Sequence, residues 1–190
     1  MGNGYFEDET FESINYKEKR IPAGSYELCR FVDCDFSEAD LSGLQFTECE
    51  FSGCNMSMVK LNNTAFNDIK FVDCKLQGAN FEPCNTVLFS VSFEKCILNY
   101  TSFYKRSLKK TRFSVCTIHE ADFTEADLSG SVFESCDLHN TRFENTLLEK
   151  ADLRTSFNFS IDPEKNKIKK AVFSVPGVLA LLEKFDIVIK

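Results

Sequence analysis

Cysteine and histidine are the residue types in this sequence that could bind a metal ion or act as nucleophile and base. The chain has 9 Cys and 2 His among its 190 residues. The histidines, His119 and His139, are 20 residues apart, and six cysteines follow nearly the same spacing. These six are Cys34, Cys54, Cys74, Cys96, Cys116 and Cys136. The spacing allows two interpretations, a metal site or a stack of structural side chains.

A zinc site would need thiolates that converge on one point about 2.3 Å away. The candidate ligands are Cys29, Cys34, Cys49 and Cys54, but side chains that repeat in parallel do not converge, and the sequence has no CxxC pair. The other interpretation, which we favour, treats each cysteine as a small buried filler that stays reduced in the cytoplasm. The two histidines are expected at the surface without a third ligand, which favours a solvated pair over a metal site. We therefore expect neither a metal nor a cofactor.

Motifs of enzyme active sites are absent from the sequence. It contains no GxSxG, P-loop, GxGxxG or HExxH pattern. Its many Ser, Thr, Asp and Glu residues occupy regular positions of a repeat, which accounts for them without catalysis. We expect no enzymatic activity.

The repeat has a period of five residues, which neither a helix nor a strand produces. From Phe6 to Phe81 every fifth residue is apolar or aromatic, in 16 of 16 positions. The register then slips by two and continues from Leu88 to Leu153 in 14 of 14 positions. Two residues before the 25 positions in Phe31–Phe81 and Leu88–Leu153 a small side chain stands in 22 cases, and the exceptions are Leu44, Ile69 and Arg106. Each unit therefore directs one small and one large side chain inward.

This pattern resembles the pentapeptide-repeat family, whose unit is A-(D/N)-L-x-x. Close matches are ADLSG at 39–43 and 126–130, ADFTE at 121–125, and ADLRT at 151–155. The resemblance covers residues 26–173 and implies an all-β fold, a right-handed quadrilateral parallel β-helix in which four units make one coil. Side chains 20 residues apart should then stack. One such stack is Phe11, Phe31, Phe51, Phe71, Phe93, Phe113 and Phe133, and another is Leu88, Leu108, Leu128 and Leu148.

The expected boundaries follow the repeat. Residues 1–25 are an imperfect first coil or a cap. The register break near residues 83–87 is either a small bulge tolerated at a corner or a protruding contact loop. Residues 174–190 should form a capping α-helix, begun by Ser174, and a short strand. We also expect this apolar end to make a homodimer contact through Val178, Leu179, Leu181, Leu182, Phe185, Ile187 and Ile189.

Charge is distributed unevenly along the chain, whose net charge is −7. Residues 1–60 and 114–162 each carry a net charge of −7, and they flank a basic belt at Lys105, Arg106, Lys109, Lys110 and Arg112. Such a surface would repel nucleic acid. The sequence also has no apolar run of membrane-spanning length. With no signal-peptide profile at its N-terminus, we expect a cytoplasmic protein.

An acidic rod with an apolar C-terminal helix resembles the quinolone-resistance proteins of the Qnr and MfpA type. That resemblance implies a dimeric DNA mimic that binds DNA gyrase or topoisomerase IV, with carboxylates in place of phosphates. The alternative is a scaffold that binds another protein through its flat faces, with the acids serving solubility. The candidate partner-binding residues are Asp33, Asp35, Glu38, Asp40, Glu48, Glu50, Glu120, Asp122, Glu125, Asp127, Glu134 and Asp137.

Overall fold

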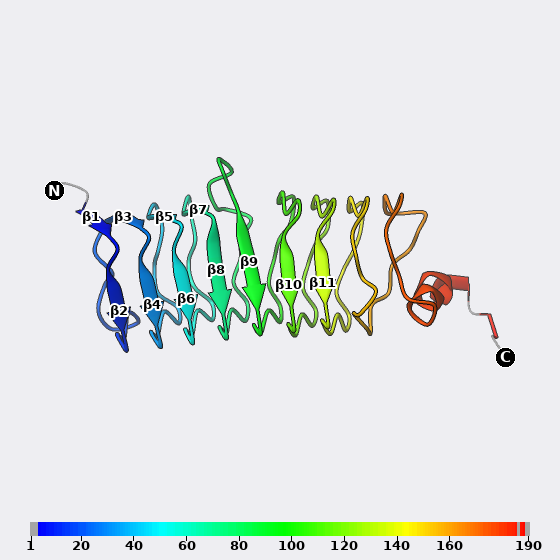
Figure 1. Cartoon of the computed structure of the whole chain (residues 1–190), viewed down its shortest axis with the longest axis horizontal. Coiled ribbons are helices and arrows are strands. Elements are labelled where there is room, and N and C mark those ends of the chain that lie inside the picture. The colour runs from blue at the N-terminus through cyan, green and yellow to red at the C-terminus, as the bar shows by residue number, and fades with distance from the viewer. Residues whose placement is uncertain (1–3, 186, 189–190) are drawn as a thin grey trace.

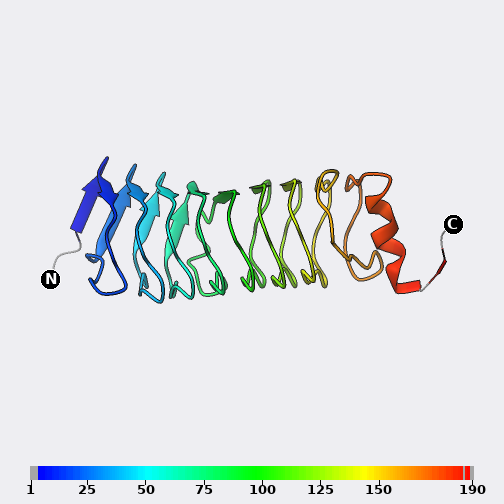
Figure 2. The ribbon, with the colours of Figure 1, turned by 90° about the horizontal axis from the view of Figure 1, so that it is seen from below.

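The structure is a computed structural model that describes residues 4–185 and 187–188. The chain winds into a straight rod with the N-terminal coil at one end and the C-terminal helix at the other (Figures 1 and 2). It is a right-handed, four-sided parallel β-helix, as the five-residue period and its family resemblance predict. No helix among these residues is long and apolar enough to span a bilayer.

Two parallel sheets form two sides of the rod. The first sheet contains β1 (Gly4–Glu7), β3 (Gly24–Glu27), β5 (Gln45–Thr47) and β7 (Ala65–Asn67). The second sheet contains β2 (Thr10–Glu12), β4 (Arg30–Val32), β6 (Glu50–Ser52), β8 (Ile69–Val72), β9 (Val91–Glu94), β10 (Arg112–Ser114) and β11 (Val132–Glu134). Isolated parallel bridges, such as Asp35 with Asn55 and Ser107 with Asp127, continue the pairing elsewhere. Each coil therefore pairs with the next coil.

The predicted phenylalanine stack is confirmed and runs along the second sheet. Phe31 pairs with Phe51 in the strand register, and their rings stack with centroids 4.7 Å apart. The stack continues across the two-residue slip, where Phe71 and Phe93 are 5.3 Å apart. Rings of adjacent sides meet edge to face, as Phe31 and Phe46 do at 5.9 Å. Because coils contact mainly their neighbours, stability comes from coil–coil interfaces.

The leucine stack was wrong at one position. Leu108, Leu128 and Leu148 are buried as predicted, whereas Leu88 is 71% exposed. Phe89 packs against the core instead, with its ring 6.5 Å from that of Phe66. The reason is that the extra residues form a loop, which carries Leu88 outward before the chain returns to the rod. This loop projects between β8 and β9 in Figure 1.

The geometry that repeats at the corners explains why the repeat unit contains an aspartate. Asp40 and Asp127 each accept a hydrogen bond from the backbone N–H two residues later, at 3.0 Å in both cases. This Asx turn stabilises the corner. The last residue of the unit adopts a left-handed conformation at most corners, with φ of 50° at Asp33 and 75° at Gly43. Asp and Asn side chains therefore stabilise the turns while Leu and Phe fill the interior.

The two ends of the rod differ. Residues 4–25 wind as a first coil, in which β1 pairs with β3 and β2 pairs with β4. At the other end the predicted helix is η1 (Gly177–Phe185), a 3₁₀ helix whose Gly177 N–H donates to the Ser174 hydroxyl. A strand was expected after it, but Ile187 and Val188 form neither strand nor helix. Ile189 and Lys190 lie outside the described residues.

Candidate protein-binding surface

The twelve candidate acids do not converge on one side of the rod. Asp33 lies at the corner after the second sheet, whereas Glu48 lies at the corner after the first sheet. Asp40 and Asp122 lie on a third side, in bridges with Lys60 and Ser102. The four-sided coil causes this spread, because acids five residues apart in sequence fall on different sides. Any partner therefore contacts only a subset of them.

Ion pairs engage half of the candidate acids. Each of these pairs joins neighbouring coils, so the partners are about 20 residues apart in sequence. The shortest joins Arg112 Nη2 to Glu134 Oε2 at 2.5 Å. The paired acids and their partners are Glu38 with Lys17, Glu50 with Arg30, Glu125 with Lys105, Asp127 with Lys109, Glu134 with Arg112, and Asp137 with His119. Sequence reasoning missed these pairs, although opposite charges 18 to 22 residues apart would have indicated them.

The unpaired candidates divide further by their local bonds. Asp35 and Asp122 each accept a backbone N–H bond, from Ser37 and Thr124, and Asp40 is bound in the same way. Those carboxylates keep only part of their hydrogen-bonding capacity for a partner. Glu48 makes no ion pair within residues 4–185 and 187–188 and is exposed. Asp33 is exposed and unpaired among the described residues in the same way, so Glu48 and Asp33 are the best placed of the N-terminal candidates to meet a cationic partner.

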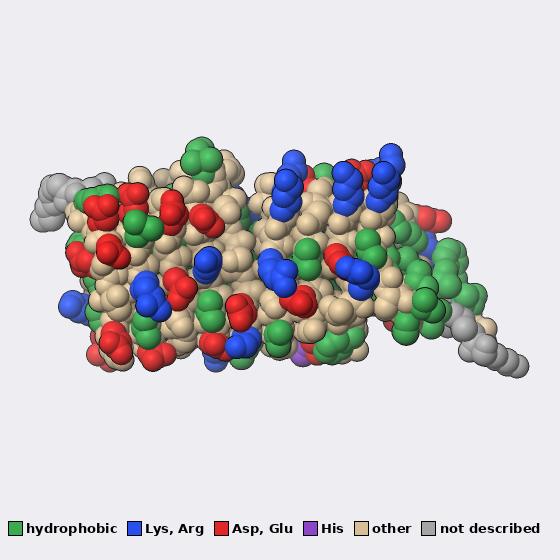
Figure 3. Space-filling view, in the orientation of Figure 1, with side chains coloured by type: hydrophobic (Ala, Val, Ile, Leu, Met, Phe, Trp, Pro, Cys, Tyr) green, Lys and Arg blue, Asp and Glu red, His purple; other side chains and the backbone are tan. Residues whose placement is uncertain are grey.

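Charge separates along the length of the rod. Residues 1–85 carry 15 acidic and 7 basic side chains, whereas residues 86–190 carry 14 acidic and 15 basic ones. Acidic side chains cover much of the N-terminal half in Figure 3, and lysines project from the upper edge of the C-terminal half. The N-terminal half is therefore the anionic surface of the protein.

The basic belt is not entirely a surface feature. Arg106 is buried, and its guanidinium donates to the carbonyls of Cys84 and Asn85 at 3.0 Å each. The guanidinium also lies 4.2 Å from the centroid of the Phe89 ring. It occupies an inward small-residue position, where the loop has left space for a long side chain. Arg106 therefore holds the base of the loop rather than meeting solvent.

The nine cysteines are buried and free. The thiol of Cys54 donates to the carbonyls of Phe31 and Ser52, and the other members of the stack do the same with their own neighbours. Burial raises the pKa of Cys49 to about 11 and that of Cys84 to about 12, so both are neutral thiols at neutral pH. Within residues 4–185 and 187–188 no three Cys, His, Asp or Glu side chains are arranged to hold a metal ion. This geometry supports the filler interpretation.

His119 and His139 lie next to each other, as their spacing predicts, with ring centroids 5.6 Å apart. Oδ2 of Asp137 lies 2.8 Å from Nε2 of His119, and the other carboxylate oxygen accepts a bond from Asn158. The pKa of Asp137 is lowered; burial opposes this shift, and the bonds from His119 and Asn158 produce it. The Asp137 carboxylate thus lies between His119 and Asn158 and holds them together in a polar patch.

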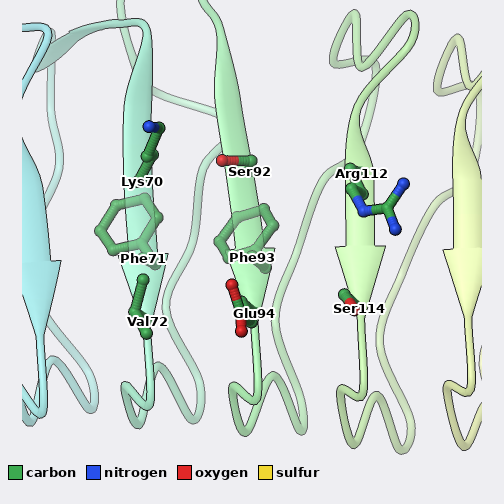
Figure 4. A pocket seen from close by; sticks show the side chains of 8 residues that line it. All are labelled: Lys70, Phe71, Val72, Ser92, Phe93, Glu94, Arg112 and Ser114. Atoms are coloured by element: carbon green, nitrogen blue, oxygen red, sulfur yellow. The ribbon is translucent and has the colours of Figure 1, made fainter.

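An open groove crosses the outer surface of the second sheet. This groove of about 390 Å³ lies over β8, β9 and β10 (Figure 4). Its outward side chains include Lys70, Ser92, Glu94 and Arg112, and the Ser92 hydroxyl donates to the carbonyl of Ile69. Small-molecule sites are generally deep apolar pockets, and this groove is open and lined mainly by polar side chains. Its flat shape suits contact with a macromolecule.

The C-terminal helix presents an apolar surface. Val178, Leu179, Leu182 and Phe185 are exposed, whereas Leu181 packs against the core. Ile187 is also exposed, and Ile189 lies outside the described residues. The helix therefore covers the last coil with the side that carries Leu181 and exposes its opposite, apolar side.

The fold and repeat define the class of protein. A model of the pentapeptide repeat region matches residues 25–88 and 86–157, and the chain belongs to the pentapeptide-repeat family. No curated protein sequence matches the chain.

Solved structures support this fold. The chain is similar to a trypsin-treated form of QnrB1, a plasmid-mediated fluoroquinolone resistance protein, with 20% identity and a TM-score of 0.72 over 98% of this chain and 92% of that one. It also matches HetL from the cyanobacterium Nostoc, a pentapeptide repeat protein involved in the regulation of heterocyst differentiation. That match has 17% identity and a TM-score of 0.45, and it covers 88% of this chain and 84% of that one.

Proposed function

We propose that this protein is a non-enzymatic binding rod whose acidic N-terminal half docks on the basic DNA-binding surface of a type II topoisomerase such as DNA gyrase. The observation that carries the proposal is the excess of exposed, unpaired carboxylates in the coils before the loop. A rigid anionic rod is attracted to a surface built for phosphates. The resemblance to Qnr-type proteins makes gyrase or topoisomerase IV the first partner to test, and cytoplasmic location follows from that partner.

A supercoiling assay tests this proposal. Purified protein should inhibit supercoiling by gyrase at high protein concentration and should restore activity in the presence of ciprofloxacin at lower concentration. Bovine serum albumin of equal concentration is the control for non-specific effects. Neither inhibition nor protection over the full concentration range would overturn the proposal.

Two glutamate variants compare a free carboxylate with an ion-paired one. Glu48→Gln should weaken gyrase binding several-fold, because an unpaired carboxylate is available to a cationic partner. Glu134→Gln should have a smaller effect, because Arg112 already neutralises Glu134. Fluorescence titration of labelled rod with gyrase measures both. Equal affinities for the two variants would argue against docking through free acids of the N-terminal half.

We also propose that the exposed side of η1 forms a homodimer contact. Leu182→Glu would place a charge in that contact, so we expect the sedimentation coefficient to fall to the monomer value. Glu183→Gln, on the same helix, is the control and should leave the dimer intact. An unchanged sedimentation profile of a folded Leu182→Glu protein would remove the dimer contact.

A scaffold that binds a different protein is the second candidate. The spread of acids over all sides of the rod and the nearly neutral C-terminal half favour it, because a DNA mimic needs a continuous anionic surface. Affinity purification from the native host separates the two candidates. A recovered topoisomerase supports the first candidate, and a different recovered partner supports the scaffold.

A further inference from the structure

One edge of the rod carries a row of side chains from end to end. We call it the corner ridge, and it consists of Asp8, Leu28, Glu48, Asp68, Lys110, Gly130, Lys150 and Lys170. All eight adopt the same left-handed corner conformation, with φ between 53° and 68°. Backbone hydrogen bonds link successive coils at this edge, for example from Glu48 N–H to the Asn67 carbonyl and from Lys150 N–H to the Lys169 carbonyl.

The corner ridge reverses its charge at the middle. Asp8, Glu48 and Asp68 are on the N-terminal side, and Lys110, Lys150 and Lys170 are on the C-terminal side. In Figure 3 basic side chains gather along the upper edge of the C-terminal half. The residues directly before the ridge positions follow this polarity in part, with Glu7 and Glu27 on one side and Lys109 and Lys169 on the other, whereas Glu149 is an exception on the basic side.

These charges lack partners within the rod. Among the described residues, none of the six charged corner-ridge side chains forms an intramolecular ion pair. Lys150 and Lys170 also stand in adjacent coils, about 4.8 Å apart along the rod. Like charges directly opposite in a sheet are destabilising. A neutralising partner would relieve that cost.

The loop stands where the charge reverses. Val87 and Leu88 at its tip are both highly exposed, 68% and 71%. In Figure 1 the loop projects from the same edge, and Arg106 fixes its base. The edge therefore has an apolar centre with an acidic half on one side and a basic half on the other.

We propose that the corner ridge binds the corner ridge of a second copy of this chain, with the two rods antiparallel. A two-fold axis at the loop would bring Asp68 opposite Lys110 of the other copy and Asp8 opposite its Lys170. It would also place Glu27 near Lys150 of the other copy. Such an interface is self-complementary by symmetry, and an apolar centre with a charged rim is the usual interface arrangement.

The chemistry of the ridge predicts a weak and salt-sensitive association. Exposed ion pairs contribute little individually and are screened by salt. The contact is separate from the exposed side of η1, which lies at the far end of the rod (Figure 2). Pairing would cover Glu48 and its neighbours, so it would compete with any cationic partner of the acidic half.

Oxidative cross-linking tests the proposed axis. Leu88→Cys in the full-length protein should give a covalent dimer at low salt, because the two loops meet at the axis. Met58→Cys is the matched control, since Met58 is also exposed, has the same φ of 56° and lies on another corner. The native thiols are buried and do not compete. We expect about tenfold more cross-linked dimer from Leu88→Cys than from Met58→Cys, because the two introduced thiols have a high effective concentration at the two-fold axis.

A charge exchange tests the proposed pairing in the Leu88→Cys protein. Asp68→Lys and Lys110→Glu alone should each reduce cross-linking about tenfold, because each places like charges together. The two changes combined should restore it. The corner conformation accepts both residue types, as Glu48 and Lys110 show. Equal cross-linking of Leu88→Cys and Met58→Cys, or failure of the combined variant to recover, would overturn the proposal.

Discussion

Replacing Phe51 by alanine is expected to lower the free energy of unfolding by about 3–5 kcal/mol. Phe51 is fully buried, and its ring stacks on Phe31 at 4.7 Å and on Phe71 at 5.2 Å. Alanine would leave a cavity that the two neighbouring coils cannot close, because their backbones are fixed by parallel pairing on both sides. Urea denaturation followed by circular dichroism measures the change.

Phe157→Ala is the matched control for this prediction. Phe157 lies outside the core and is 50% exposed, so its removal should change the free energy of unfolding by less than about 0.5 kcal/mol. Hydrogen exchange should also show faster opening of β4, β6 and β8 in Phe51→Ala, since coils stabilise their neighbours. A loss below about 1 kcal/mol for Phe51→Ala would contradict the continuous aromatic stack.

Arg106→Met should cost about 2–3 kcal/mol and should loosen the loop at residues 82–90. The guanidinium donates to the carbonyls of Cys84 and Asn85 and covers the ring of Phe89. Burial lowers the pKa of Arg106, yet arginine remains charged at neutral pH. Methionine would fill part of the volume and leave the buried carbonyl of Cys84 without its donor.

Two controls define that result. Arg112→Met removes an exposed arginine that pairs with Glu134, and it should cost less than about 1 kcal/mol. Limited proteolysis should cleave Arg106→Met at the loop faster than the unaltered protein. An Arg106→Met protein with unchanged stability and unchanged loop cleavage would show that the guanidinium does not hold the loop.

The sequence predicts the rod because one physical requirement repeats through the chain. Each coil must bury one large and one small side chain per side, so Phe31, Phe51 and Phe71 recur at the spacing of the coil. Parallel pairing then follows from stacking. The same argument places Cys34, Cys54 and Cys74 inside the rod, in agreement with the structure.

The loop could not be predicted from the period alone. Both Leu88 and Phe89 are large and apolar, and a two-residue slip allows either to point inward. The choice depends on Arg106, whose charge needs the carbonyls that the loop offers and whose plane covers Phe89. These contacts of Arg106 with the loop are visible only in the folded structure, where the neighbouring coils lie side by side.

The candidate site was predicted in composition but not in arrangement. An acidic sequence indicates an anionic rod, yet Glu50 and Glu125 lie beside Arg30 and Lys105 of the preceding coil. These pairs become visible only when the 20-residue spacing of the coil is applied to the charged residues as well as to the core. The helix was predicted from the apolar spacing of Val178, Leu181, Leu182 and Phe185, but that spacing did not show that Leu181 packs against the core while the other three are exposed.

The salt dependence of gyrase binding tests the central claim most directly. If the acidic half of the rod replaces DNA phosphates, the affinity of gyrase for the rod should fall at least about tenfold as salt rises from about 50 to about 200 mM. DNA should also displace the rod competitively. Binding that is insensitive to salt and to DNA, or no binding at low salt, would contradict the account.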